Sequence, residues 1–225
     1  MNEHAVIRQA AAMLLCYPDL EMLARLPLVR AAVEELPAGP ARTSLGSFCD
    51  YADVTTELEQ GAHYVDTFDL KRRRALHLTY YTDGDTRRRG HALARVKEVY
   101  RACGWRIDAT ELPDHLAVVL EFAARGDAAQ GQRLLESFQP GIELLRAALH
   151  DCASPYADVL DAVAATLPAP DEARREAARM AAAGPPVEDV GLDPYGSASK
   201  DGASTGPASN GHVPLGMPVV MGADR

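Results

Sequence analysis

Apolar side chains recur every three or four residues along most of this chain, which is the spacing of a helix with one buried face. The first such stretch covers residues 4–16, and its apolar face consists of Val6, Ile7, Ala10, Met13 and Leu14. No stretch of useful length alternates apolar and polar residues as a half-buried strand would. The pattern therefore predicts an all-α fold, a single helical globule.

Proline and glycine divide the first seventy residues into separate helices. The first helix should end at residues 17–19, because Pro18 disfavours helical geometry in the residue before it. Asp19 is placed to cap a short helix, and another helix should run from about Leu28 until the Pro-Ala-Gly-Pro sequence at 37–40. From Ser44 to Leu70 the spacing predicts one long helix, or two with a break.

Helical spacing continues in the second half of the chain. Leu93 to Cys103 predict a helix that stops at Gly104, since glycine is the usual residue just past a helix end. Glu111-Leu112-Pro113-Asp114 should open the next helix, because proline suits the first turn and acids suit its positive end. That helix should end at Arg125-Gly126.

Three more helical stretches follow, and then the composition changes. Pro140 should kink or divide the helical stretch from Leu134 to Leu149, and further helices are expected over 156–167 and 171–183. Residues 184–225 contain eight glycines and six prolines, a third of the segment, which is typical of disorder. We therefore expect a helical domain over 1–183 and a disordered tail over 184–225.

Length and charge narrow the class of protein. The chain has 225 residues, enough for one domain with a sizeable core, and its net charge of −9 argues against broad nucleic-acid binding. The four cysteines form no Cys-x-x-Cys pair, so the spacing for zinc or redox work is missing. Each falls among apolar neighbours, which predicts buried free thiols at Cys16, Cys49, Cys103 and Cys152. Neither a signal peptide nor an apolar run of membrane-spanning length is visible, so we expect a soluble, cytoplasmic protein.

The densest mixture of apolar and charged side chains lies between Tyr64 and Gly90. It contains the cationic run 71–74, a turn signal at 83–85 and a second cationic run at 87–89. A helix with a solvated charged face, followed by a loop, would have the same pattern. A charged loop held between helices is nevertheless where binding function concentrates, which makes this stretch the candidate site.

Motifs for catalysis and metal binding are missing from the sequence. It has no Gly-x-Ser-x-Gly and no phosphate loop, and no two of its seven histidines are four residues apart. Isolated histidines such as His77 and His115 are more often satisfied core residues than ligands. Acid pairs such as Asp66/Asp69, Asp83/Asp85 and Glu111/Asp114 would need a pocket to transfer protons. The sequence thus predicts no catalytic residue and no metal ligand.

Several motifs resemble, in order, the NarJ-type assembly chaperones of respiratory nitrate reductase (the delta subunit), relatives of the TorD-like chaperones. The resemblance spans roughly residues 6–170. The motifs that carry it are Leu14-Leu15-x-Tyr17-Pro18-Asp19, Tyr64-Val65-x-x-Phe68-Asp69 with Leu76-His77-Leu78, Gly84-Asp85-x-Arg87-x-Arg89-Gly90, and Glu111-Leu112-Pro113-Asp114-His115-Leu116 with Leu120-Glu121-Phe122.

The resemblance implies a dedicated chaperone rather than an enzyme. Such a protein binds the immature catalytic (alpha) subunit, by its N-terminal segment, and assists molybdenum cofactor insertion and complex assembly. It implies no permanently bound cofactor, only a transient contact with the molybdenum cofactor, and neither a nucleic-acid partner nor membrane insertion. The residues that it places around the client peptide are Tyr64, Asp66, Phe68, Asp69, His77, Asp85, Arg87, Arg89 and Gly90, with Glu111, Pro113, Asp114 and His115 as a second wall.

Structural roles compete with binding roles at these positions. Tyr64 and Phe68 have the spacing of core residues, Gly90 could serve a turn or a close approach, and Asp85 could pair internally with Arg87 or Arg89. At the level of function, two alternatives stay open. The arginines at 72–74 and 87–89 could grip the phosphates of a guanine nucleotide or of molybdopterin guanine dinucleotide, or the chain could be a helical enzyme with an unmarked site.

Overall fold

The computed structural model describes residues 2–108 and 111–184 and confirms the all-α fold; its only β pairing there is one isolated bridge, between His77 and His115. The predicted tail beyond Gly184 lies outside these residues, so its disorder and the domain boundary stay predictions. The elements are α1 (Glu3–Leu14), α2 (Leu20–Glu34), α3 (Pro40–Val54), α4 (Glu57–Tyr64), the π-helical turn η1 (Val65–Asp69), the 3₁₀ turn η2 (Arg72–Arg74), α5 (Thr79–Asp83), α6 (Arg87–Ala102), α7 (Leu116–Arg125), α8 (Ala128–Ser137), α9 (Gln139–Asp151), α10 (Tyr156–Ala164) and α11 (Asp171–Ala183).

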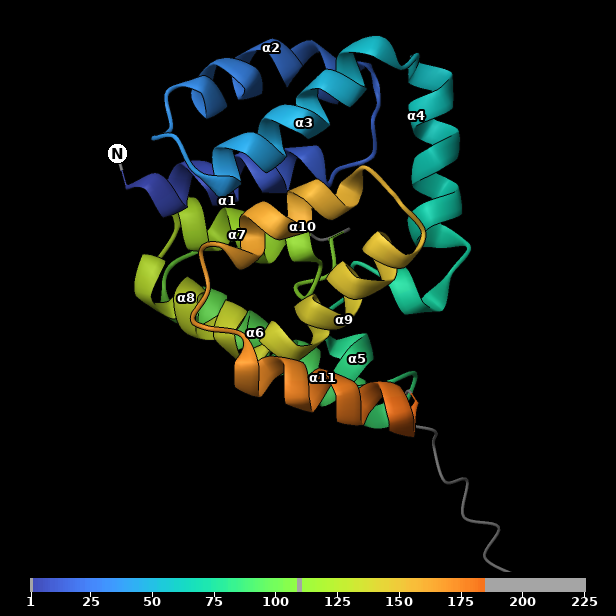
Figure 1. Cartoon of the computed structure of the whole chain (residues 1–225). Helices are drawn as coiled ribbons and strands as arrows, with labels where there is room; N and C mark the ends of the chain where they lie inside the picture. Colours follow the sequence, from blue (N-terminus) through green and yellow to red (C-terminus); the bar gives the residue numbers. More distant parts are fainter. Residues whose placement is uncertain (1, 109–110, 185–225) are drawn as a thin grey trace, which may run out of the picture. The chain divides into compact units, whose positions relative to one another are not determined.

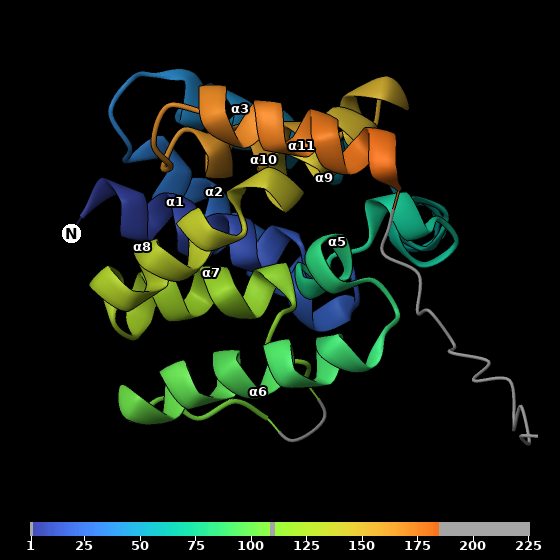
Figure 2. The same cartoon turned by 90° about the horizontal axis from the view of Figure 1, so that it is seen from below.

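Helix α1 is the centre of the helical unit. It packs mainly on α7, with α2, α3 and α10 around it (Figures 1 and 2). Leu14 on α1 and Leu116 and Leu120 on α7 have no exposed surface. Burying such side chains contributes about 1.5–3 kcal/mol each, so this interface is a main source of stability.

An aromatic cluster joins the α3–α4 segment to α10. Tyr156, which is 1% exposed, has its ring centroid 4.9 Å from Phe48, 4.8 Å from Phe68 and 5.9 Å from Tyr64, and it stacks on His63 at 5.8 Å. Aromatic pairs at these separations add to the stability that burial alone supplies. The cluster fixes the position of η1, where the candidate site begins.

The predicted helix boundaries need one correction near Asp19. Its Oδ1 accepts a hydrogen bond from the Met22 N–H at 2.8 Å, so Asp19 caps a helix as predicted. However, α2 continues through Pro27 to Glu34, and the two helices predicted there are one. Met22, Leu26, Val29 and Val33 form one continuous buried face, and its packing offsets the hydrogen bond that Pro27 cannot donate.

Two other breaks were predicted correctly. The stretch from Ser44 to Leu70 takes the second predicted form, two helices with a break, and Thr56 and Glu59 form a capping box at the start of α4. The first of these helices begins at Pro40 rather than Ser44, because proline suits the first helical position. Pro140 lies in the first turn of α9, just after α8 ends, and so divides the helices.

The predicted start of α7 at Glu111–Asp114 is wrong, because the helix begins at Leu116. The backbone before it is extended and pairs with a distant segment. The Leu78 N–H donates to the Asp114 carbonyl at 3.0 Å, and the Leu116 N–H donates to the Leu76 carbonyl at 2.8 Å. These long-range bonds override the local signals of proline and acid that are typical of a helix start.

The prediction of buried thiols is also only partly right. All four cysteines are free, but Cys16 and Cys152 are exposed, Cys103 is half-buried and only Cys49 is buried. Cys16 and Cys152 lie just past the ends of α1 and α9, where the apolar face stops. Within 2–108 and 111–184, no helix is both long enough and apolar enough to span a bilayer.

Candidate functional site

The bridge between His77 and His115 brings together two motifs that are far apart in the sequence. Leu76-His77-Leu78 lies beside Asp114-His115-Leu116 through the two backbone hydrogen bonds described above. The Tyr100 hydroxyl donates to the Pro113 carbonyl at 2.7 Å and so fixes the entry to the second motif. The chain thereby places His77, Asp114 and His115 in one cluster.

Asp114 is the anchor of this cluster and has no exposed surface. Its Oδ2 accepts hydrogen bonds from the Thr79 hydroxyl at 2.6 Å and from the Thr79 N–H at 3.1 Å. His77 Nδ1 lies 3.4 Å from its Oδ1, and Arg89 Nη2 lies 3.8 Å from its Oδ2. Burial by itself raises the pKa of Asp114, but the contacts from His77 and Thr79 more than offset burial and hold the pKa below its usual value.

His115 carries no charge near neutral pH. Burial, and secondarily the neighbouring His77, lower the pKa of His115 to about 4. The two imidazole rings are 5.3 Å apart at their centroids and meet edge to face. They are therefore neighbours in one cluster, although 38 positions separate them in the sequence.

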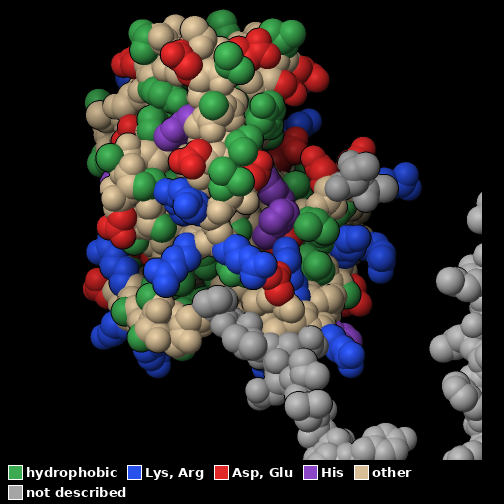
Figure 3. All heavy atoms as spheres, turned by 90° about the vertical axis from the view of Figure 1, so that its right-hand side faces the viewer, with side chains coloured by type: hydrophobic (Ala, Val, Ile, Leu, Met, Phe, Trp, Pro, Cys, Tyr) green, Lys and Arg blue, Asp and Glu red, His purple; other side chains and the backbone are tan. Residues whose placement is uncertain are grey.

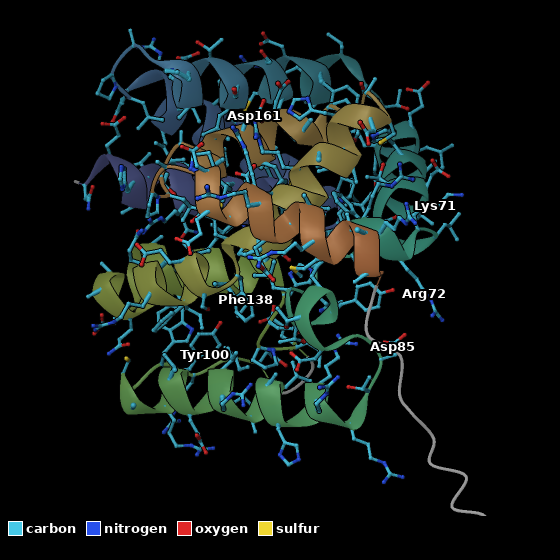
Figure 4. All side chains as sticks on the ribbon, turned by 60° about the horizontal axis from the view of Figure 1, so that its bottom comes forward. Lys71, Arg72, Asp85, Tyr100, Phe138 and Asp161 are labelled. Carbon is cyan, nitrogen blue, oxygen red and sulfur yellow. The ribbon has the colours of Figure 1, made fainter. Side chains whose placement is uncertain are left out.

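Charged side chains beside this cluster form a chain of ion pairs around Asp85. We call Arg72, Asp85 and Arg89 the rim. Arg72 and Arg89 each lie 3.5 Å from an Asp85 carboxylate oxygen, and the Arg89 Nε–H donates to the Thr79 hydroxyl at 3.2 Å. Figure 4 shows Arg72 and Asp85 near the end of α6 closest to α5. The predicted internal pair between Asp85 and Arg89 is confirmed, and through Thr79 it connects the rim to Asp114.

A hollow of about 320 Å³ opens at this rim. Figure 3 shows cationic and histidine side chains gathered on the face of the molecule that includes α4 and α5. Five of the residues predicted to bind a client line the hollow, together with Arg72, Ala75 and Tyr80. Those five are Phe68, Asp69, His77, Asp85 and Arg89.

Other predicted residues have different surroundings. Tyr64 is a core residue, because its hydroxyl donates to the Leu15 carbonyl at 3.2 Å and its ring packs on Phe68. Asp66 and Glu111 are exposed, and neither lines the hollow. Pro113 is buried beneath the site and, as described above, does not start a helix.

Gly90 serves neither a turn nor a close approach, so that expectation is wrong. Arg87 to Gly90 form the first turn of α6 instead of a loop. A Cβ atom built on Gly90 would meet no atom within 4 Å, and the positive φ of this region belongs to Gly84. The turn at 83–85 therefore requires glycine at position 84, whereas glycine at position 90 only lowers the stability of α6.

We expect Gly90→Ala to stabilise the protein by about 0.5–1 kcal/mol, the helix-propensity difference between the two residues. Urea unfolding followed by circular dichroism at 222 nm would measure it. The matched control is Gly84→Ala, which forces a side chain into positive φ and should destabilise. A loss of stability in Gly90→Ala would contradict the open space seen around this residue.

Sequence reasoning missed two positions that shape the site. Thr79 holds Asp114, and Tyr80 lines the hollow, but neither residue stands out in a linear pattern. The sequence singles out Arg74 as part of the cationic run, but as a candidate to grip phosphates. In the structure it donates to the Thr67 and Asp66 carbonyls at 2.9 and 3.0 Å and so closes the η1 turn; the wider turn of a π-helix is a frequent feature of functional sites.

Comparison with a solved structure supports the all-α class to which the fold belongs. The solved structure of a putative redox enzyme maturation protein from Archaeoglobus fulgidus matches with a TM-score of 0.51 over 80% of this chain and 94% of that one. The two sequences are 17% identical, so this likeness concerns the fold alone.

Residues 34–162 match the family described as nitrate reductase delta subunit, and the chain belongs to that family. It is 32% identical to a probable nitrate reductase molybdenum cofactor assembly chaperone, NarJ of Bacillus subtilis, over 74% of this chain and 90% of the relative. It is also 39% identical to the nitrate reductase-like protein NarX of Mycobacterium tuberculosis H37Rv, over 72% of this chain but only 24% of that longer protein. The resemblance drawn from the motifs is thus confirmed.

Proposed function

We propose that this protein is a dedicated chaperone that binds the immature catalytic (alpha) subunit of respiratory nitrate reductase and assists molybdenum cofactor insertion and complex assembly. The observation that carries the proposal is family membership, with a NarJ chaperone matched over nine-tenths of its length. The protein would bind this subunit in the cytoplasm, before the complex is assembled. Contact with the cofactor would be transient, while the client is held.

The hollow at the rim is where we place the client's N-terminal segment. Phe68 and Tyr80 line the hollow but are buried, so the surface open to a peptide is mainly that of Arg72, Asp85 and Arg89, which offer both signs of charge. Charges of both signs fix the register of a bound peptide. Because Asp85 is held between Arg72 and Arg89, the rim is ordered before binding, which lowers the entropic cost of association.

The proposal assigns no catalytic step to the site. Asp114 and His115 lie beside the hollow and have lowered pKa values, but neither residue lines the hollow. Asp114 has no exposed surface, and Thr79 occupies one of its oxygens with two hydrogen bonds. A carboxylate in that position orders two segments of the chain and cannot reach a substrate.

Titration calorimetry with a peptide that copies the N-terminus of the alpha subunit would test client binding. We expect Arg72→Glu to weaken binding by about tenfold, since it reverses a charge at the rim. The Arg72 side chain is exposed, so folding should be preserved. Arg87 is exposed as well but does not line the hollow. Arg89→Gln is preferred to Arg89→Glu, because a second carboxylate beside Asp114 would disturb the fold itself.

Arg133→Glu on α8 is the matched control, an exposed arginine that does not line the hollow. Equal weakening by Arg133→Glu would mean that net charge, and not this rim, controls affinity. A peptide that fails to bind the unaltered chain even at low salt would refute the peptide site.

A second candidate function is direct binding of a guanine nucleotide or of molybdopterin guanine dinucleotide. It is favoured by Arg72, His77 and Arg89, which line the same hollow and could meet phosphates. Asp69 and Asp85 line it too and would repel them. Saturable binding in a titration with guanosine diphosphate would support this candidate over the peptide.

A further inference from the structure

Charge is strongly segregated along this chain. Residues 71–106 contain eleven Lys and Arg against three acids, a net charge of +8. The rest of the chain contains twelve Lys and Arg against 29 acids, a net charge of −17. Such an imbalance within one acidic protein creates a local positive potential that the overall charge conceals.

Helix α6 carries much of this positive charge on its outward face. Ala92, Val96 and Tyr100 are buried against the bundle, and Figure 2 shows α6 as an outer layer of the helical unit. Its 16 residues extend about 24 Å at 1.5 Å per residue. The exposed cationic or histidine residues on the opposite half of the helix, which we call the basic face, are Arg87, Arg88, His91, Arg95, Lys97 and Arg101.

Most of the basic face makes no ion pair within the described residues. In 2–108 and 111–184, Arg88, Arg95, Lys97 and Arg101 make no ion pair with a carboxylate, whereas Arg30 and Arg146 each bridge two acids elsewhere. The first turn of α6 contains three arginines and no acid. Positive charges there oppose the helix dipole and destabilise the helix, and among the described residues Arg88 has no carboxylate partner that would offset this cost.

We propose that the basic face of α6 binds an anionic phospholipid surface, a property beyond the chaperone role proposed above. A lipid surface attracts clustered cations by charge alone, and arginine pairs well with phosphate. A straight helix with cations along its length suits a flat array of headgroups. Binding of this kind is peripheral and requires no helix that crosses the bilayer.

The composition of the basic face favours lipid over other polyanionic partners. Single-stranded nucleic acid needs exposed aromatic rings on which bases stack, but the one aromatic residue of α6, Tyr100, is buried. A protein partner needs a large apolar or aromatic anchor, but Leu93 and Val99 are half-buried and Ala94 is small. The solvent side of α6 presents mainly positive charge, with Glu98 as the single exposed acid of this helix, and a net positive charge is enough for attraction to an anionic lipid surface.

Co-sedimentation of the full chain with vesicles would test this. We expect binding to phosphatidylcholine vesicles that contain phosphatidylglycerol, no binding to pure phosphatidylcholine, and loss at high salt. The double variant Arg88→Glu/Arg95→Glu should lower the partition coefficient by at least about tenfold. Arg88→Lys/Arg95→Lys keeps the charge and should keep the binding.

The matched control is Arg133→Glu/Arg175→Glu, which changes the net charge equally through exposed arginines on α8 and α11. It should bind vesicles as the unaltered chain does. Equal loss in both double reversals, or no sedimentation with anionic vesicles, would overturn the proposal. A single-stranded oligonucleotide that binds through the same arginines while vesicles do not would assign the basic face to nucleic acid instead. Far-ultraviolet circular dichroism verifies that every variant is folded.

Discussion

Replacing Asp114 by alanine is expected to lower the free energy of unfolding by about 3–5 kcal/mol, the cost of breaking a buried charged network from one side. The carboxylate is fully buried and holds the Thr79 hydroxyl and N–H, with His77 and Arg89 beside it. Alanine would leave the two Thr79 donors without their acceptor and would remove one of the two carboxylates beside Arg89. Urea unfolding followed by circular dichroism would measure the loss.

Two further variants separate the contributions within this network. Thr79→Val keeps the carboxylate but removes one donor, and should cost about 1–3 kcal/mol. Asp66→Ala is the control, since Asp66 is an exposed acid of the same stretch, and its effect should stay within about 0.5 kcal/mol. If Asp114→Ala cost no more than Asp66→Ala, Asp114 would not be the anchor of the site.

Local patterns in the sequence were sufficient for most helices. The three-to-four spacing located the apolar faces of α1, α9 and α10, and Asp19 and Pro140 marked a helix start and a division correctly. These features depend on neighbours within one or two turns. A linear reading of the chain can therefore find them.

Features that depend on distant partners could not be predicted in this way. Pro113 and Asp114 have the local signature of a helix start, yet their backbone is extended because it pairs with residues more than thirty positions earlier. Nothing in the sequence near Thr79 indicates that its hydroxyl meets a carboxylate 35 residues away. Cys16 has apolar neighbours in the sequence, yet it is exposed, because it lies just past the end of α1 where the buried face stops.

The resemblance to a family supplied what periodicity could not. It named both motifs that meet at the bridge, and five of its predicted residues line one hollow. It could not separate residues that line this hollow from those that support it. Tyr64 and Pro113 belong to the support, because each is buried and engaged in a hydrogen bond to another segment.

The stability of the fold should depend on pH through His115. Its pKa is about 4 in the folded chain and about 6.5 when unfolded, so the unfolded state binds more protons between these values. The free energy of unfolding should therefore fall as pH decreases from about 6.5 to about 4, by about 2–3 kcal/mol from this group. Asp114, whose pKa is lowered, should add a further loss only at more acidic pH.

The variant His115→Gln isolates this contribution. It removes the titrating ring, so the difference in stability between pH 7 and pH 4.5, from urea unfolding at each pH, should shrink by about 2 kcal/mol. A smaller dependence of stability on pH should remain from His63, because burial also lowers the pKa of His63. His91→Gln, a substitution of an exposed histidine on α6, is the control and should keep the full slope. If His115→Gln kept the full slope as well, protonation would be occurring elsewhere. The pairing of 76–78 with 114–116 would then not be what excludes the proton from His115.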